Sequence, residues 1–329
     1  MPENSDLDAE QLRTMYYYMV LSRELDRRIW ILNRQGKSAF VISGQGQEGV
    51  QVGAAMALDV KTDWLAPYYR DMAMVLAFGM SAREVMLGQL GKAADPSSGG
   101  RQMPSHFGHR AKRILTGSSP VTTQVVHAVG MAWAAKLKGD HAVVLTSLGE
   151  GSTNQGEFHE ALNFASVQRV PVIVLVENNG YSISVPQSRE MAIRDVAVRA
   201  QGYGMPGVVV QGSDPLAVYQ VVAAARTKAI TGGGPTLIEA KTHRFTAHSS
   251  DDDDRSYRSR QQLADEKKDD AVIRFQHWLI TAQLWDDERE RALKARVRHE
   301  VDDATEYALL AALPAAETMS DHVYGYPPA

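Results

Sequence analysis

The sequence predicts an α/β fold in which a mostly parallel sheet is flanked by helices. Two short apolar runs, residues 141–148 and 172–176, stop abruptly at glycine or polar positions, as buried parallel strands do. Between them, residues 155–168 repeat apolar side chains at helical spacing, so the stretch forms one strand–helix–strand unit. Beyond residue 257 the apolar spacing is helical throughout, which predicts a helical C-terminal tail.

The first expected element is a long helix over residues 8–34, rich in aromatic and methionine side chains, which we expect to form an arm that packs on a neighbouring chain. A second helix is expected to run to about Leu58, after the glycine-rich residues 44–49. Those glycines formally fit a dinucleotide-binding fingerprint, with Asp63 near the usual offset. Because the apolar run before them is very short and residues 59–62 are polar, a nicotinamide dehydrogenase is the weaker alternative.

Strands and helices continue to alternate after the central unit. A strand is expected at residues 208–210, a helix at 215–230, and another strand at 236–240 after a run of three glycines. In the C-terminal tail, one helix carries apolar residues at spacings of three and four, which predicts a buried stripe: Leu293, Val297, Val301, Ala304 and Ala308.

The length allows one large sheet domain with appendages. The chain has 329 residues, of which 44% are hydrophobic, enough to bury a substantial core. We expect an N-terminal helical arm (residues 1–36), an α/β domain (37–260) and a C-terminal helical extension packed on that domain (261–329).

The composition excludes several classes of function. A net charge of −4 without a basic stretch gives no sign of nucleic-acid binding. The absence of cysteine excludes disulfides, thiolate metal sites and a cysteine nucleophile. No apolar run approaches the roughly 20 residues that span a bilayer, and the polar start does not resemble a signal peptide. We therefore expect no membrane association, and the simplest location is the cytoplasm of a bacterium.

Polar side chains follow both strands of the central unit. A Gly-Glu-Gly triplet at residues 149–151 ends the first strand, and Asn178, Asn179, Gly180 and Tyr181 follow the second. Ligands of open parallel sheets bind beyond the carboxyl ends of the strands, which meet at one edge. Mg²⁺ takes oxygen ligands and completes its shell with phosphates and water. Ordinary turn chemistry explains each motif alone, but the two together favour a metal–diphosphate site.

The paired motifs resemble the signature of thiamine diphosphate enzymes, Gly-Asp-Gly followed by Asn-Asn. The resemblance implies that the carboxylate of Glu150, the amide oxygen of Asn179 and the backbone carbonyl of Tyr181 hold the Mg²⁺ of the cofactor's diphosphate. Glutamate replaces the usual aspartate, which keeps the charge and lengthens the arm by one methylene. The residues around the acid are then expected to contact the cofactor: Gly149, Gly151 and Ser152.

Further stretches narrow the resemblance to the α chain of the decarboxylase component of 2-oxo acid dehydrogenase complexes. The chain is most similar to the branched-chain (3-methyl-2-oxobutanoate) type, and the pyruvate and acetoin types are close alternatives. The matching stretches are residues 44–48, 68–71, 100–104, 106–108, 118–120 and 246–252.

The family resemblance implies a diphosphate contact for Tyr69 and Arg70. A guanidinium suits a diphosphate because its planar fork donates two parallel hydrogen bonds. Taken alone, the tripeptide would rather indicate a surface arginine paired with Asp71. Branched-chain relatives often place an arginine before the asparagine pair, where this chain has Glu177. We expect Glu177 either to point away from the diphosphate or to pair with a cation.

The segment around Pro120 matches the family's contacts to the aminopyrimidine ring, through Ser119 and the backbone of Val121. The same segment also fits a helix start, because proline is well placed in a first turn. The resemblance further implies a monovalent cation, K⁺ in the family, near four residues: Ser118, Pro120, Thr123 and Gln124.

Two of the ten histidines match functional positions of the family. His248 corresponds to a histidine near the diphosphate and the reacting carbon, and His106 to one that lines the substrate cavity, with Tyr68 as a second wall residue. The polar loop at residues 249–254 resembles a segment that becomes ordered over the cofactor and the lipoyl arm, so we expect it to be mobile. Ser249 matches a position that is phosphorylated in some relatives.

The resemblance implies decarboxylation of a 2-oxo acid and transfer of the acyl group to the lipoyl group of an acyltransferase component. The glutamate that activates the aminopyrimidine belongs to a separate β chain in this family, so we expect an α₂β₂ heterotetramer and an α chain that is inactive alone. A non-catalytic assembly scaffold, in which the aromatic arm mediates contacts, is the alternative from a different class.

Overall fold

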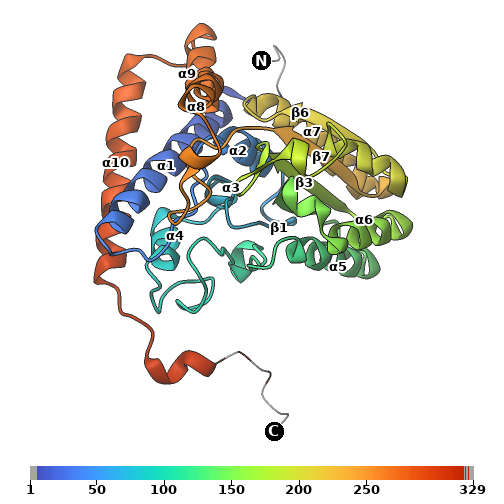
Figure 1. Cartoon of the computed structure of the whole chain (residues 1–329), viewed down its shortest axis with the longest axis horizontal. Helices are drawn as coiled ribbons and strands as arrows, with labels where there is room; N and C mark the ends of the chain where they lie inside the picture. The colour runs from blue at the N-terminus through green and yellow to red at the C-terminus, as the bar shows by residue number, and fades with distance from the viewer. Residues whose placement is uncertain (1–5, 322, 324, 326–329) are drawn as a thin grey trace.

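A five-stranded parallel sheet forms the centre of the computed structural model, which describes residues 6–321, 323 and 325. The strand order is β1-β2-β3-β7-β6, and every neighbouring pair is parallel. The predicted α/β fold is therefore confirmed (Figure 1). The strands are β1 (Trp64–Ala66), β2 (Val144–Gly149), β3 (Val172–Asn178), β6 (Gly207–Gln211) and β7 (Thr236–Lys241). The remaining residues of the expected terminal segments, 1–5, 322, 324 and 326–329, lie outside the described part of the chain.

The central unit forms as the apolar pattern predicts, and its strands bury both faces. Strand β2 leads through α6 (Gly156–Gln168) to β3, all of whose residues are buried. Ile173 and Leu175 of β3 face one core with helices α1, α2, α3 and α7. Val174 and Val176 face a second core with α5 (Thr123–Lys138) and α6. A strand that is buried on both faces has a continuous apolar sequence. The sequence therefore predicted both β2 and β3.

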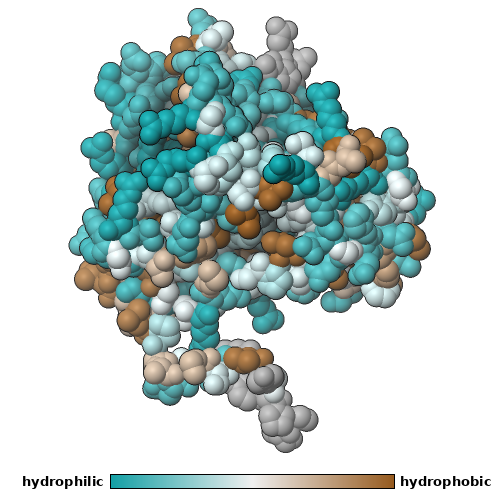
Figure 2. Space-filling view, in the orientation of Figure 1, coloured by the Kyte–Doolittle hydropathy of each residue, from teal (hydrophilic) through white to brown (hydrophobic). Residues whose placement is uncertain are grey.

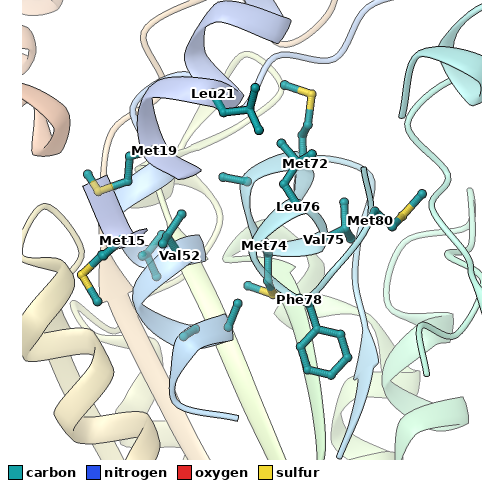
Figure 3. Close-up of a cluster of buried hydrophobic side chains, with 14 of the residues drawn as sticks. Met15, Met19, Leu21, Val52, Met72, Met74, Val75, Leu76, Phe78 and Met80 are labelled. Atoms are coloured by element: carbon teal, nitrogen blue, oxygen red, sulfur yellow. The ribbon is translucent and has the colours of Figure 1, made fainter. Parts of the chain in front are cut away.

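Helix α1 (Ala9–Arg34) buries one face against its own chain. Asp8 and Gln11 close a capping box at its start. Its Met15, Met19 and Leu21 pack with side chains of α2 (Glu48–Met56) and α3 (Met72–Ala77), as Figure 3 shows. Packing of the rest of α1 on a neighbouring chain stays a prediction, because amphipathic spacing indicates that a face is buried and not which chain buries it.

A glycine within α2 permits close helix packing. A Cβ on Gly53 would lie 2.5 Å from the carbonyl oxygen of Pro215, at the start of α7 (Pro215–Lys228). Asp63, which the dinucleotide fingerprint would use on a ribose, is fully buried and forms an ion pair with Arg226. No strand precedes Gly44 among the described residues, so the dinucleotide interpretation has no structural support.

The C-terminal part is helical, as predicted, and its stripe is buried. It comprises α8 (Arg260–Glu266), α9 (Ala271–Thr281) and α10 (Asp287–Leu310), and all five predicted stripe residues of α10 are buried. Helix α10 packs along α1 and α4 (Ala82–Gln89). None of the helices in the described part of the chain has the length and apolar character needed to cross a membrane.

Several short elements escaped the sequence-based prediction. These are strand β1, helices α3 and α4, and a small antiparallel pair, β4 (Tyr181–Ser182) and β5 (Val185–Pro186). The helix start expected at Pro120 was also wrong. Helix α5 begins at Thr123, because Thr122 takes a left-handed conformation with φ of 81°.

Candidate functional site

A cavity of about 340 Å³ lies beyond the carboxyl ends of β2 and β3. Every residue that the sequence assigned to the cofactor, Mg²⁺ or the substrate lines it: Tyr68, Tyr69, Arg70, His106, Ser119, Val121, Gly149, Glu150, Gly151, Ser152, Asn179, Tyr181 and His248. These residues come from segments spread over most of the chain, so the fold brings them together. In the orientation of Figure 1, Figure 2 shows a mostly hydrophilic surface with small apolar patches near its middle.

Glu150 and Asn179 present oxygen atoms without partners. Glu150 is fully buried one residue beyond β2, and its Oε2 accepts a hydrogen bond from the backbone N–H of Asn179 at 3.2 Å. Its Oε1 and the Oδ1 of Asn179 are buried without a hydrogen-bond donor. Burial raises the pKa of Glu150 to about 7. A cation held between these oxygens would satisfy both and favour the ionised acid, so the donor set fits Mg²⁺.

The two turns that carry these ligands are interlocked. A Cβ on Gly151 would lie 2.3 Å from the Oγ of Ser182, so only glycine lets the turn after β2 approach the segment after β3. Asn178 shapes the second turn: its amide donates to Glu239 at 2.6 Å, and its Oδ1 accepts from the N–H of Gly180 at 3.0 Å. The first asparagine of the pair is therefore structural, and the second faces the cavity.

Arg70 and His248 lie together in the cavity wall. The guanidinium of Arg70 donates to the carbonyl of Ser43 and, at 3.3 Å, to both Nδ1 and the carbonyl oxygen of His248. Because arginine cannot accept, Nδ1 of His248 is the acceptor and Nε2 carries the proton. Burial, with the nearby charges of Arg70 and Arg244, lowers the pKa of His248 to about 4, so the ring is neutral at pH 7.

Arg244 is a cavity residue that the sequence-based reasoning missed. Its side chain is 1% exposed and donates to the carbonyl of Ile183 and the hydroxyl of Tyr257, both at 2.8 Å. Its Nε is buried without a partner. Arg244 lies three residues beyond β7, at the same edge of the sheet as the two motifs. That position was the available signal, because β7 itself had been predicted.

Ser119 and His106 form a hydrogen-bonded pair in the cavity. Nδ1 of His106 lies 3.1 Å from the carbonyl oxygen of Pro104, which can only accept, so Nδ1 carries the ring proton. Nε2 is then the acceptor for the hydroxyl of Ser119 at 2.6 Å. The Ser119 hydroxyl has given its only proton to this bond, and its oxygen remains free to accept one from a ligand.

The loop that follows His248 is anchored by polar contacts. Asp252 accepts hydrogen bonds from the backbone N–H of His248 at 2.8 Å and from the hydroxyl of Tyr257 at 2.5 Å. Arg258, which is 6% exposed, donates to the carbonyls of Thr246 and Arg244. The expected mobility of this loop stays a prediction.

Glu177 and Asp71 form a buried acidic pair behind the cavity. Oε2 of Glu177 accepts from Gln51 at 3.0 Å and from the hydroxyl of Tyr68 at 3.3 Å, and no cation contacts it. Asp71 is fully buried and accepts from the backbone of Tyr68 and the hydroxyl of Ser147, which excludes the alternative of a surface pair with the neighbouring arginine. Burial raises the pKa of both acids. Each acid also has one oxygen without a donor, which a single shared proton would satisfy.

The residues of the implied monovalent cation site do not line this cavity. Three of their polar groups already have partners: Ser118 donates to the carbonyl of Pro120, Thr123 donates to Glu157, and the amide of Gln124 donates to a backbone carbonyl. Only Oε1 of Gln124 is buried without a partner. Within the described ranges, no group of three or more His, Cys, Asp or Glu side chains could hold a metal by itself.

Comparison with known proteins decides the family. A family model described as "Dehydrogenase E1 component" matches residues 16–317. The chain belongs to the dehydrogenase E1 component family. The 2-oxoisovalerate dehydrogenase subunit alpha of Bacillus subtilis (strain 168) is 53% identical over 318 residues, which cover 97% of this chain and 96% of the relative.

More distant members of the E1 family carry similar names. The 3-methyl-2-oxobutanoate dehydrogenase subunit alpha of Mycobacterium tuberculosis (strain CDC 1551 / Oshkosh) is 41% identical, covering 89% of this chain and 77% of the relative. The mitochondrial 2-oxoisovalerate dehydrogenase subunit alpha of Homo sapiens is 36% identical, covering 99% and 73%. The resemblance to a thiamine diphosphate-dependent E1 α chain of the branched-chain type, predicted from the motifs, is confirmed.

Proposed function

We propose that this E1 chain is the α subunit of a branched-chain 2-oxo acid dehydrogenase and supplies the metal–diphosphate half of its active site. The observation that carries the proposal is the pair of unpartnered oxygens on Glu150 and Asn179, which line a cavity together with Arg70 and Arg244. The names of the relatives favour a branched-chain substrate over pyruvate or acetoin.

The cofactor and metal roles follow from the chemistry of the cavity wall. Glu150, Asn179 and the carbonyl of Tyr181 would hold Mg²⁺, and Arg70 and Arg244 would neutralise the diphosphate. Thiamine diphosphate, when bound, supplies the electron sink for decarboxylation. The contacts proposed for the rest of the cofactor involve Tyr69, Ser119, the backbone of Val121, and Gly149, Gly151 and Ser152.

The chain's own residues would orient the substrate and place its protons. His248 offers an N–H donor at Nε2 and stays neutral at pH 7, so it can hydrogen-bond an oxygen of a 2-oxo acid. The hydroxyl of Ser119 donates its hydrogen bond to His106. Its oxygen can therefore accept a hydrogen bond from the exocyclic amine of the cofactor ring. The hydroxyl of Tyr68 is held by Gln47 at 3.0 Å, which fixes this wall of the substrate pocket.

A β subunit is the proposed partner, in an α₂β₂ assembly that acylates the lipoyl group of an acyltransferase component. Residues just before α5 and α6 line the cavity, and both helices carry exposed apolar side chains, as interaction surfaces do. The exposed residues on these helices are Val126, Trp133, Leu137, Phe164 and Val167. Binding of K⁺ near Ser118, Pro120, Thr123 and Gln124 and a bacterial cytoplasmic location stay predictions.

Reconstitution with the β chain tests the function. The α–β assembly, supplied with Mg²⁺ and thiamine diphosphate, should decarboxylate 3-methyl-2-oxobutanoate with a higher kcat/KM than pyruvate, measured by release of CO₂. A higher kcat/KM for pyruvate would show that pyruvate, and not 3-methyl-2-oxobutanoate, is the preferred substrate. No turnover of any 2-oxo acid, together with no Mg²⁺-dependent cofactor binding in calorimetry, would favour the assembly scaffold.

A further inference from the structure

Asp26 is a buried acid on α1 whose contacts all go to one loop. Its side chain is 2% exposed. Oδ2 accepts hydrogen bonds from the hydroxyl of Ser43 at 2.9 Å and the backbone N–H of Gly44 at 2.8 Å, and Oδ1 accepts from the amide of Gln45 at 3.2 Å. All three partners are donors, so the carboxylate form satisfies them and a protonated acid would add a fourth donor.

The loop held by Asp26 in turn holds Arg70. The carbonyl of Ser43 accepts from Nη1 of Arg70. A Cβ on Gly44 would lie 2.9 Å from the carbonyl oxygen of Arg70, so the loop fits closely against the arginine's backbone. The side chain of Gln51 donates to that same carbonyl at 3.1 Å. A shift of the loop would therefore move the guanidinium that faces the cavity.

The surroundings of Asp26 contain no cation that pairs with it. The charged group that acts on it is Glu48 of α2, which raises its pKa further. Arg23, one turn earlier on α1, is bound to Glu48 and to Asp270, and loop residues 43–45 carry no charge. Burial raises the pKa of Asp26 to about 6. A buried, unpaired carboxylate is unfavourable for folding alone, which points to a task that needs its acceptors.

We infer that Asp26 is a positioning residue for the diphosphate site, acting on Arg70 through Ser43 and Gly44. The ligand class is a metal-bound diphosphate. The inference rests on the proposed function, because that function assigns Arg70 to the diphosphate. Asp26 itself lies behind Ser43 and does not line the cavity.

Binding of inorganic diphosphate with Mg²⁺ to the α–β assembly, measured by calorimetry, tests this inference without turnover. Asp26→Ala removes all three loop contacts and should weaken binding about 10-fold to 100-fold, as loss of supporting groups does at metal sites. Ser43→Ala removes one link to Asp26 but keeps the carbonyl that Arg70 needs, and should weaken binding about 3-fold.

Asp63→Asn is the matched control. Asp63 is also fully buried and accepts from backbone and arginine donors, but it directly precedes β1, at the opposite edge of the sheet from the cavity. The Asp63→Asn variant should bind diphosphate with an affinity within about 2-fold of wild type. Its thermal stability should be lower, because the ion pair with Arg226 is lost. A purely structural Asp26 would behave as this control does.

The pH profile provides a second readout. Protonation of Glu150 below about pH 7 weakens Mg²⁺ binding in wild type and variants alike, so the readout is the affinity of Asp26→Asn relative to wild type, which should change below about pH 6, where Asp26 takes up a proton. Asp26→Asn keeps the shape without the ionisation, so its affinity relative to wild type should rise toward parity at low pH. Wild-type protein that binds no diphosphate would overturn the proposed function. Asp26 and Ser43 variants that bind as tightly as wild type, with an unchanged pH profile, would overturn the positioning role alone.

Discussion

Two buried glutamates lie at the ends of neighbouring strands, and their surroundings differ in one decisive respect. Glu150 follows Gly149, whose register partner across the sheet is Glu177. Both side chains are fully buried, burial raises the pKa of both, and each keeps one oxygen without a donor. The free oxygen of Glu150 adjoins a cavity that Asn179 also faces, whereas Glu177 is enclosed by Asp71, Gln51 and Tyr68.

This difference shows that burial alone does not identify a residue that binds a metal ion. An unpartnered oxygen beside a cavity can accept a cation that arrives with a diphosphate. An unpartnered oxygen beside a second buried acid can share a proton with it, as paired carboxyls do. We therefore propose that Glu150 binds a ligand and that Glu177 stabilises the wall behind it.

The largest effect is expected for Glu150→Gln. Loss of the charged ligand should weaken Mg²⁺-dependent binding of thiamine diphosphate to the α–β assembly at least about 100-fold, as measured by calorimetry. Glu177→Gln, at the end of the neighbouring strand, is the matched control. Equal losses in the two variants would contradict the distinction between them.

A substantial loss of stability is expected for Asp71→Ala. The change leaves the N–H of Tyr68, the hydroxyl of Ser147 and the acid of Glu177 without their buried partner, which should lower the free energy of unfolding by about 1 to 3 kcal/mol. Urea denaturation of the purified protein measures it. Asp71→Asn keeps an acceptor and should lose less than about 1 kcal/mol; a greater loss in the asparagine variant would exclude a shared proton.

A smaller, pH-dependent effect is expected for His248, a buried base beside cations. Its pKa is lowered in the folded state, so both states are neutral above pH 7, and below about pH 6.5 the unfolded chain alone takes up a proton. The folded state should therefore lose about 1 kcal/mol relative to a His248→Gln variant between pH 7 and pH 5, after allowance for partial solvent contact. Parallel stability curves for the two proteins would contradict the lowered pKa.

The smallest effect is expected for Glu177→Gln itself. A neutral amide resembles the protonated acid, so the free energy of unfolding should change by less than about 1 kcal/mol and the cofactor affinity by less than about 3-fold. Urea denaturation measures the free energy of unfolding, and calorimetry on the same preparation measures the cofactor affinity. A large loss of cofactor affinity would place a charged Glu177 in the site.

The sequence predicted which residues meet at the cavity where they follow a local pattern. Glu150 and Asn179 were predictable because each follows a buried strand, and the edge of a parallel sheet brings strand ends together. Short elements were not, because β1 has three residues and α3 has six, too few for a period to emerge. Helix α5 begins only after Thr122, because that residue has a left-handed conformation. No pattern in the sequence predicts this conformation.

Residues that act through distant contacts were also beyond prediction. Asp26 is separated from Ser43 by 17 positions, and Arg70 from His248 by 178, so no spacing rule connects them. Arg244 and the Asp71–Glu177 pair depend in the same way on how separate segments pack. The sequence reveals groups at strand ends, and only the packed structure reveals what supports them.

The cavity wall also has consequences for redesign of substrate range. Its polar groups are linked by hydrogen bonds, but five of its lining side chains are apolar: Phe40, Ile42, Met103, Val121 and Ile183. Exchanging these breaks no buried polar network, and each methylene gained or lost changes discrimination between acyl chains by only about 1 to 3 kcal/mol. Directed evolution can therefore change the size of the proposed acyl pocket in small steps. The polar groups proposed to bind the cofactor stay unchanged.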